Sequence, residues 1–244
     1  MKRILFLVLL FITYLAKAGS FYWVGGSGSW SSITSWSQTS GGSAGLTIPS
    51  VGDTVYFNGG SGLNGSSVVT LDVAIDVAIF DFSAANTAFQ FQCALPSISI
   101  SNILSGSANP TFTGWTGFWN ITTNTTGSII SNGRVWSNDI KMTGTGVLTA
   151  SVINSTADLY LNSGTLNLSG SNSTIANFYS LTATPRNINL SNAIITLSGP
   201  TWNVNAINFS IVHTNSRINL NNAGTTVFTG VVKIIMSFIS ILAL

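Results

Sequence analysis

The sequence predicts an all-β protein built as a right-handed parallel β-helix, a solenoid in which short strands stack turn upon turn. Three observations predict this fold. Apolar and polar residues alternate over short segments, similar segments recur at nearly constant intervals, and no long helical period of apolar residues occurs after the N-terminal leader. An antiparallel β-sandwich is the main alternative, because alternation alone does not distinguish parallel from antiparallel pairing.

The composition fits a solenoid that contains few ionic groups. Of the 244 residues, 45% are hydrophobic and only 6% are charged, and Glu is absent. A chain this hydrophobic can bury a core, and its abundant Gly, Ser, Thr and Asn suit turns and strand faces. Outside the leader, five basic residues stand against six Asp. No basic patch can then neutralise phosphates, so we predict no nucleic-acid binding.

Residues 1–18 have the pattern of a secretory signal peptide. Two basic residues precede the apolar run 4–15, and residues 16–18 read Ala-Lys-Ala, a small-x-small cleavage site. The apolar run is about a dozen residues long, whereas a helix needs roughly 20 to span a bilayer. We therefore expect a secreted or cell-surface protein that meets the membrane only transiently, through this peptide.

Residues 19–66 are expected to form a cap rich in Trp and Gly. The three Trp rings of this segment can fold over the first turn, whose open edge would otherwise pair with other strands. The alternative is a carbohydrate-binding module in which exposed Trp rings stack on sugars. The candidate contacts are Trp23, Trp30, Trp36, Trp115 and Trp119, with Trp136 as a further ring.

Residues 67–230 are expected to form the coils of the β-helix. The clearest repeats begin at Leu159, Ile188 and Ile218, so their starts are nearly evenly spaced along the chain. Each repeat has a short alternating strand, an Asn/Ser/Gly turn and a second strand. We predict that these three residues form one column in the core, and that strands pair in parallel at this spacing. Asn suits the bends because it tolerates the left-handed conformation.

An earlier segment of the coils shows the same alternation with one interruption. Every odd residue from Val69 to Ile79 is apolar, and the phase then changes at Phe80 and Phe82. A change of phase within a strand predicts a bulge or a corner at that point.

Residues 231–244 form an apolar tail, which lacks the abundant Asn, Gly and Thr of the preceding segments. Three interpretations compete: a marginal membrane anchor, a last buried strand, and a truncated or frame-shifted end. We favour the third interpretation, because a β-stack that ends in a bare apolar segment lacks a polar cap.

The start of the mature chain resembles that of a bacterial family. Residues 21–30 read Phe-Tyr-Trp-Val-Gly-Gly-Ser-Gly-Ser-Trp, Trp36 follows, and residues 52–57 read Gly-Asp-Thr-Val-Tyr-Phe. This pattern resembles the opening of large repetitive surface proteins of Bacteroidetes-type bacteria, and it is similar to the Trp-Gly-Gly openings of autotransporter passengers. The resemblance covers roughly residues 21–82. It implies a secreted, parallel β-helical, adhesin-like role at the bacterial outer surface, as a fragment of a larger protein.

We predict no catalytic residues, no cofactor and no metal site. His213 is the only His and is interpreted as a strand residue, while Cys93 is interpreted as a small buried hydrophobe. The less favoured alternative is a polysaccharide-acting enzyme that uses Asp72, Asp76 and Asp81. Along one straight strand Asp72 and Asp76 would lie about 13 Å apart, too far for a pair of glycosidase carboxylates. We predict a structural, adhesin-like protein whose partner is an extracellular glycan or a surface protein.

Overall fold

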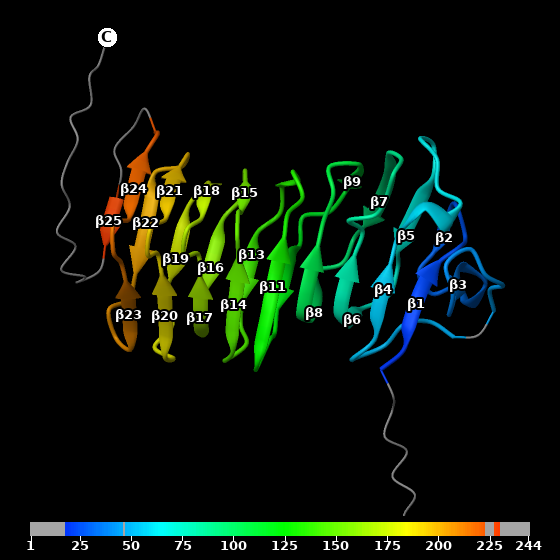
Figure 1. The fold of residues 1–244 in the computed structure, drawn as a ribbon, viewed down its shortest axis with the longest axis horizontal. Coiled ribbons are helices and arrows are strands. Elements are labelled where there is room, and N and C mark those ends of the chain that lie inside the picture. Colours follow the sequence, from blue (N-terminus) through cyan, green and yellow to red (C-terminus); the bar gives the residue numbers. More distant parts are fainter. Residues whose placement is uncertain (1–17, 46, 223–226, 230–244) are drawn as a thin grey trace, which may run out of the picture.

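Strands from successive turns lie side by side and in parallel along the described part of the chain, apart from β3 near the N-terminal end (Figure 1). The computed structural model describes residues 18–45, 47–222 and 227–229. In this part of the chain the fold is a β-solenoid of about eight turns, which confirms the parallel β-helix, and the sandwich alternative is not needed. The apolar run of the expected leader and the tail 231–244 lie outside the described residues. No helix among the described residues is long and apolar enough to cross a bilayer.

Each turn contributes short strands to three faces, which we call the first, second and third face. The strands β6 and β8 are long enough to bend across two faces, so their first halves lie on the first face and their second halves on the second. They span Ile75–Asp81 and Ser97–Ser105. The other strands of the first face are β10 Phe118–Ile121, β13 Ile140–Met142, β16 Leu159–Leu161, β19 Phe178–Ser180, β22 Thr201–Val204 and β25 Val227–Thr229.

The remaining strands make up the second and third faces. Those of the second face are β1 Ser20–Trp23, β4 Thr54–Tyr56, β11 Thr126–Ile130, β14 Val147–Ala150, β17 Gly164–Asn167, β20 Arg186–Asn189 and β23 Phe209–Val212. The third face holds two sheets. The first contains β2 Gly28–Ser29, β5 Val68–Leu71, β7 Phe89–Cys93 and β9 Pro110–Thr113. The second contains β12 Val135–Trp136, β15 Asn154–Ser155, β18 Asn172–Ile175, β21 Ile194–Leu197 and β24 Arg217–Leu220.

The pairing register corrects the predicted spacing of the repeats. Leu159 pairs with Phe178 on the first face, Ile188 pairs with residues of β17 and β23 on the second, and Ile218 pairs with Ile195 on the third. The prediction of one column was therefore wrong. The three faces use similar strands, and the step from one repeat start to the next combines one full turn with a move to the next face.

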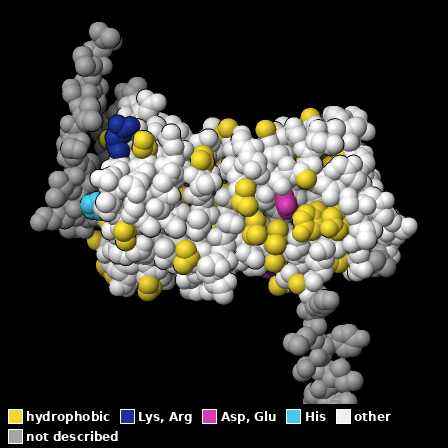
Figure 2. All heavy atoms as spheres, viewed as in Figure 1, with side chains coloured by type: hydrophobic (Ala, Val, Ile, Leu, Met, Phe, Trp, Pro, Cys, Tyr) yellow, Lys and Arg dark blue, Asp and Glu magenta, His cyan; other side chains and the backbone are white. Residues whose placement is uncertain are grey.

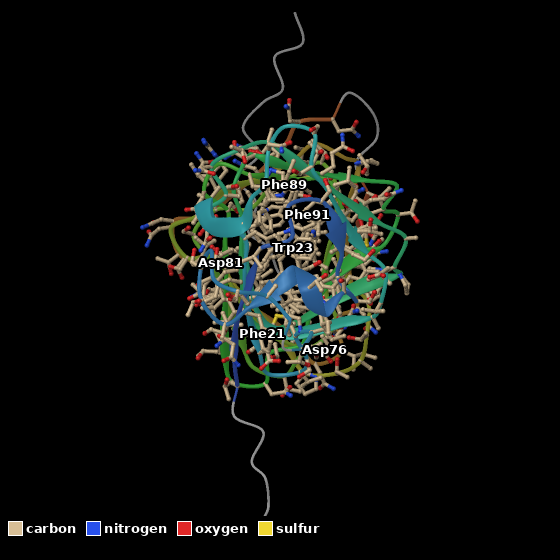
Figure 3. The ribbon with its side chains drawn as sticks, turned by 90° about the vertical axis from the view of Figure 1, so that its right-hand side faces the viewer. Phe21, Trp23, Asp76, Asp81, Phe89 and Phe91 are labelled. Atoms are coloured by element: carbon tan, nitrogen blue, oxygen red, sulfur yellow. The ribbon has the colours of Figure 1, made fainter. Side chains whose placement is uncertain are left out.

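The alternation of the strands buries one side of each in a single continuous core. Viewed along the solenoid, Trp23, Phe89 and Phe91 point into its centre, whereas Asp76 and Asp81 lie on its outside (Figure 3). The N-terminal half of the core is mainly aromatic, and the later turns are filled mainly by Leu and Ile. The predicted change of phase is confirmed, because the register of β6 against β8 shifts between Val77 and Ile79.

Left-handed residues stack at one corner of the solenoid. Gly170, Asn192 and Asn215 all have positive φ, at 70°, 57° and 52°. The Asn215 side chain donates to Asn192 Oδ1 at 3.5 Å, so the bends of successive turns lie in register. This confirms the predicted role of Asn. Only Gly, and to a lesser extent Asn and Asp, adopt this conformation without a large steric penalty.

The predicted N-terminal cap is present at the first turn. The strand β3 (Trp36–Ser37) follows the 3-10 helix η1 (Ile33–Ser35), and it pairs antiparallel with β1. Trp30 and Trp36 pack edge to face, with their ring centroids 4.7 Å apart. A second 3-10 helix, η2, spans Gly59–Ser61. The parallel strand β4 already lies within the expected cap segment, so the cap and the coils share one core.

Candidate functional site

The Trp rings proposed as carbohydrate contacts are buried. The exposed fractions of Trp23, Trp30, Trp36, Trp115 and Trp119 lie between 0% and 7%, and Trp136 is also buried. Several indole N–H groups donate to backbone carbonyls inside the protein, as Trp115 Nε1 does to Leu95 O at 2.8 Å. The hypothesis of an exposed Trp platform is therefore corrected. These rings fill the solenoid, because their size suits the interior and their N–H groups find partners there.

The three acidic residues of the enzyme alternative are dispersed. Asp72 accepts hydrogen bonds from the backbone N and Oγ of Ser31, at 3.0 and 2.6 Å. Burial acts to raise the pKa of Asp72, but the Ser31 hydrogen bonds outweigh it and the pKa lies below its ordinary value. Asp76 lies on the first face, and Asp81 lies on the second (Figure 3). This arrangement does not bring the three carboxylates to one site.

The lone His and the lone Cys occupy unrelated places. His213 is exposed and directly follows β23. Cys93 ends β7 and is buried, as predicted, and burial raises the pKa of its thiol. Among the residues that the structure describes, no group of three or more His, Cys, Asp or Glu could hold a metal ion.

The outer side of the first face carries a row of aromatic and charged side chains. The strands β13, β16 and β19 read Ile-Lys-Met, Leu-Tyr-Leu and Phe-Tyr-Ser. In each strand the first and third residues are buried. Because side chains alternate along a strand, the middle residues Lys141, Tyr160 and Tyr179 point outward. The parallel register places them in successive turns of one row.

The aromatic rings of this row are stacked and hold the Lys. Tyr160 and Tyr179 stack with their ring centroids 5.0 Å apart and their planes at 19°. Lys141 Nζ lies 4.0 Å from the ring centroid of Phe118 and 4.8 Å from that of Tyr160. Both separations are within the range of cation–π attraction, so the ammonium group is held in place on a rigid strand.

Two carboxylates border the same row. The Tyr160 hydroxyl donates to Asp158 Oδ2 at 3.3 Å, and the backbone N of Asp158 donates to Asp139 Oδ1 at 3.1 Å. The Asn177 amide donates to the other oxygen of Asp158 at 2.7 Å. Burial, followed by the charges of Asp139 and Asp158, raises the pKa of Tyr160 well above its ordinary value. The Tyr160 hydroxyl therefore stays protonated at neutral pH and can donate or accept hydrogen bonds.

We call this group the tyrosine–lysine row, and it is the candidate functional site. It combines aromatic ring surface, one cation, two carboxylates and phenolic hydroxyls on a face whose neighbouring turns lie about 4.8 Å apart. Such a surface can form stacking and hydrogen-bond contacts with a polyhydroxylated chain or with a protein. Its members are Phe118, Asp139, Lys141, Asp158, Tyr160 and Tyr179.

A second outward patch lies on the second face, near the N-terminal end. Figure 2 shows hydrophobic side chains gathered there around an acidic one. The strand register aligns its members in two neighbouring rows. Tyr22 and Tyr56 stack with their ring centroids 4.8 Å apart, and burial, then Tyr22 and Asp81, raises the pKa of Tyr56. The patch consists of Tyr22, Tyr56, Ile79, Asp81, Ile103 and Ile130.

The tyrosine–lysine row is not among the site residues that the sequence predicted. The outward position of each middle residue could be read from the short strands themselves. The alignment of these residues depends on the step of a single turn, which leads from Lys141 to Tyr160 and from Tyr160 to Tyr179. The repeat starts at Leu159, Ile188 and Ile218 predicted a longer spacing than this single turn, and at that spacing these residues do not align. Comparison of the chain with protein-family models, with curated proteins and with solved structures finds no match.

Proposed function

We propose that this chain is a secreted or cell-surface, adhesin-like structural protein that contacts an extracellular glycan or surface protein through the tyrosine–lysine row. The stacked Tyr160 and Tyr179 beside Lys141, on one rigid outer face, are the observation that carries the proposal. The leader pattern and the bacterial surface-protein resemblance support export. A chain released by signal peptidase would begin at Gly19.

A binding role is favoured over a catalytic role at this face. Lys141 is occupied by two aromatic rings, and Asp158 is occupied by hydrogen bonds from Tyr160 and Asn177. Groups held in this way provide a preorganised contact surface, which reduces the entropy lost when a partner binds. We infer that the row contributes recognition and that the solenoid beneath it contributes stiffness.

A binding assay with matched tyrosine variants tests the proposal. The full chain is applied to an array of bacterial and host glycans and of surface-protein extracts, and its best ligand is then titrated. We expect the double variant Tyr160→Ala/Tyr179→Ala to bind at least about tenfold more weakly, because Tyr160 and Tyr179 are half-buried on the outer face and aromatic anchors carry much of the binding energy of an interface. The matched control is Tyr22→Ala/Tyr56→Ala, which removes the stacked pair of the second face.

Three outcomes of this assay would contradict the proposal. Equal affinities for both double variants would show that the row is not the contact. Loss of binding only in the Tyr22/Tyr56 variant would assign the contact to the second face. Cleavage of the bound glycan, with loss of turnover in Asp158→Asn, would replace the binding role with an enzymatic one.

A further inference from the structure

The third face is interrupted between its two sheets. The strand β9 ends the first sheet and β12 begins the second, and within the described residues no strand pairing joins them. Arg134, the residue before β12, bridges this seam, because its Nη1 donates to Pro110 O at 2.7 Å and to Ser107 O at 3.2 Å. Gly106 leaves room for the side chain, since a Cβ atom there would lie 3.0 Å from Arg134 Cδ. The guanidinium group thus takes the place of strand pairing at the seam.

Arg134 is a buried cation without a carboxylate partner. Its side chain is 6% exposed, and its Cζ lies between 5.0 and 5.3 Å from the ring centroids of Phe82, Phe112 and Trp136. Burial lowers the pKa of the guanidinium group to about 10, so the group stays charged at neutral pH. No ion pair joins it to any of the six Asp residues, all of which lie in the described part of the chain. The cost of removing this charge from water is therefore offset only by neutral groups.

One edge of this guanidinium group is unused. The Nε of Arg134 is buried and, like Nη2, has no hydrogen-bond partner among the described residues. Nε and Nη2 form the edge that can donate to both oxygens of one carboxylate. Arg186 provides the contrast within the same solenoid, because its Nε, Nη1 and Nη2 all donate to carbonyl oxygens. Arg186 is thus fully occupied by the fold, whereas Arg134 keeps a pair of donors for a ligand.

A cavity of about 380 Å³ lies at the seam, and Arg134 is part of its lining. This volume is in the range of sites that hold small molecules. Phe112 and the exposed Val135 give the cavity apolar wall, and Thr111 and Ser137 line it with exposed hydroxyl side chains. A ligand that suits this lining carries a negative charge, several hydroxyl groups and some C–H surface, which is the chemistry of an acidic sugar.

We propose that the seam cavity binds the carboxylate of an acidic sugar, a hexuronate unit of a glycan. The two carboxylate oxygens accept from Nε and Nη2 of Arg134, and the hydroxyl groups of Thr111 and Ser137 pair with those of the sugar. The hydroxyl lining favours a sugar over the terminal carboxylate of a peptide. The site lies on the third face and does not depend on the tyrosine–lysine row of the first face.

Calorimetric titration of the full chain with trigalacturonate and with its methyl ester tests the ligand class. The two probes share their sugar rings, but the ester lacks the negative charges. We expect the ester to bind at least about tenfold more weakly, because hydrogen bonds between charged groups are among the strongest in proteins. Arg134→Lys keeps the charge but loses the unused edge, and it should weaken trigalacturonate binding, whereas Arg217→Lys, at an exposed position of β24, should not.

A second pair of variants leaves Arg134 in place, and so it decides the matter even if Arg134→Lys fails to fold. Val135→Trp fills the cavity from a position that is 54% exposed, and Val212→Trp makes the same change at a Val that is 46% exposed in β23. We expect Val135→Trp to lose trigalacturonate binding with an unchanged urea midpoint of unfolding, and Val212→Trp to keep both.

Three results would overturn the proposal. Equal affinities for trigalacturonate and its ester would show that no carboxylate is recognised. Loss of trigalacturonate binding in Tyr160→Ala/Tyr179→Ala but not in Val135→Trp would assign the acidic sugar to the tyrosine–lysine row. Binding of a peptide through its terminal carboxylate, lost in Val135→Trp and without any binding of trigalacturonate, would assign the cavity to a protein partner.

Discussion

Replacing Trp36 with Ala is expected to lower the free energy of unfolding by about 3–5 kcal/mol, the usual cost of emptying a buried Trp position. Trp36 is fully buried, and its ring packs edge to face against those of Trp23 and Trp30. Its indole N–H donates to Trp30 O at 2.8 Å. The variant therefore loses packing and leaves a buried carbonyl without its donor, and urea unfolding measures the loss.

Two controls separate the cap from a general effect of substitution. Trp36→Phe keeps an aromatic ring and removes the N–H donor, so it should cost less than Trp36→Ala. Val51→Ala alters a side chain that is 73% exposed and should change the stability by less than about 0.5 kcal/mol. A Trp36→Ala protein as stable as Val51→Ala would show that the Trp rings do not support the first turn.

Replacing Arg186 with Met is expected to lower the free energy of unfolding by about 3 kcal/mol, because a hydrogen bond to a charged group contributes roughly 1.5–3 kcal/mol. Arg186 lies in β20 and is buried although its side chain is charged. Its guanidinium group donates to the carbonyl oxygens of Thr184, Ser180, Asn205 and Ile207. The side chain thus ties together backbone segments of neighbouring turns.

The matched control for Arg186 is an exposed Arg in a strand of the same solenoid. Arg217 begins β24 and is exposed, so Arg217→Met should change the stability by less than about 0.5 kcal/mol. Arg186→Lys keeps the charge but loses the planar guanidinium group and its fixed set of N–H donors. This variant should be destabilised nearly as much as Arg186→Met. A fully stable Arg186→Lys would show that charge alone accounts for the effect.

Much of the fold could be predicted because its local rules are visible in the sequence. Alternation indicates the strands, Trp30 and Trp36 indicate the cap, and the phase change at Phe80 indicates the bulge, which the structure places just before it, between Val77 and Ile79. The spacing of the turns could not be predicted from the most similar segments, because all three faces demand the same alternation and therefore look alike. The better period was carried by the bends, where Gly170, Asn192 and Asn215 recur once per turn, in step with the paired strands beside them.

The candidate site was less predictable than the fold. Aromatic rings suggested sugar contacts, but burial depends on which way a residue faces and on what the next turn places over it. Trp119 faces inward, and its neighbour Phe118 faces outward beside Lys141. Tyr160 and Tyr179 are adjacent only because one turn separates them. A site formed across turns becomes visible once the register is known.

Disulfide cross-linking between successive turns tests the solenoid and its register most directly. Thr165 and Asn187 are partners on adjacent strands, and neighbouring strands lie about 4.8 Å apart, within the range that a disulfide spans. In a Cys93→Ala background, we predict that Thr165→Cys with Asn187→Cys forms an intramolecular disulfide without loss of stability. Tyr160→Cys with Asn189→Cys, a pair at the spacing of the repeat starts, should remain unlinked. Cross-linking of the second pair and not of the first would contradict this structure.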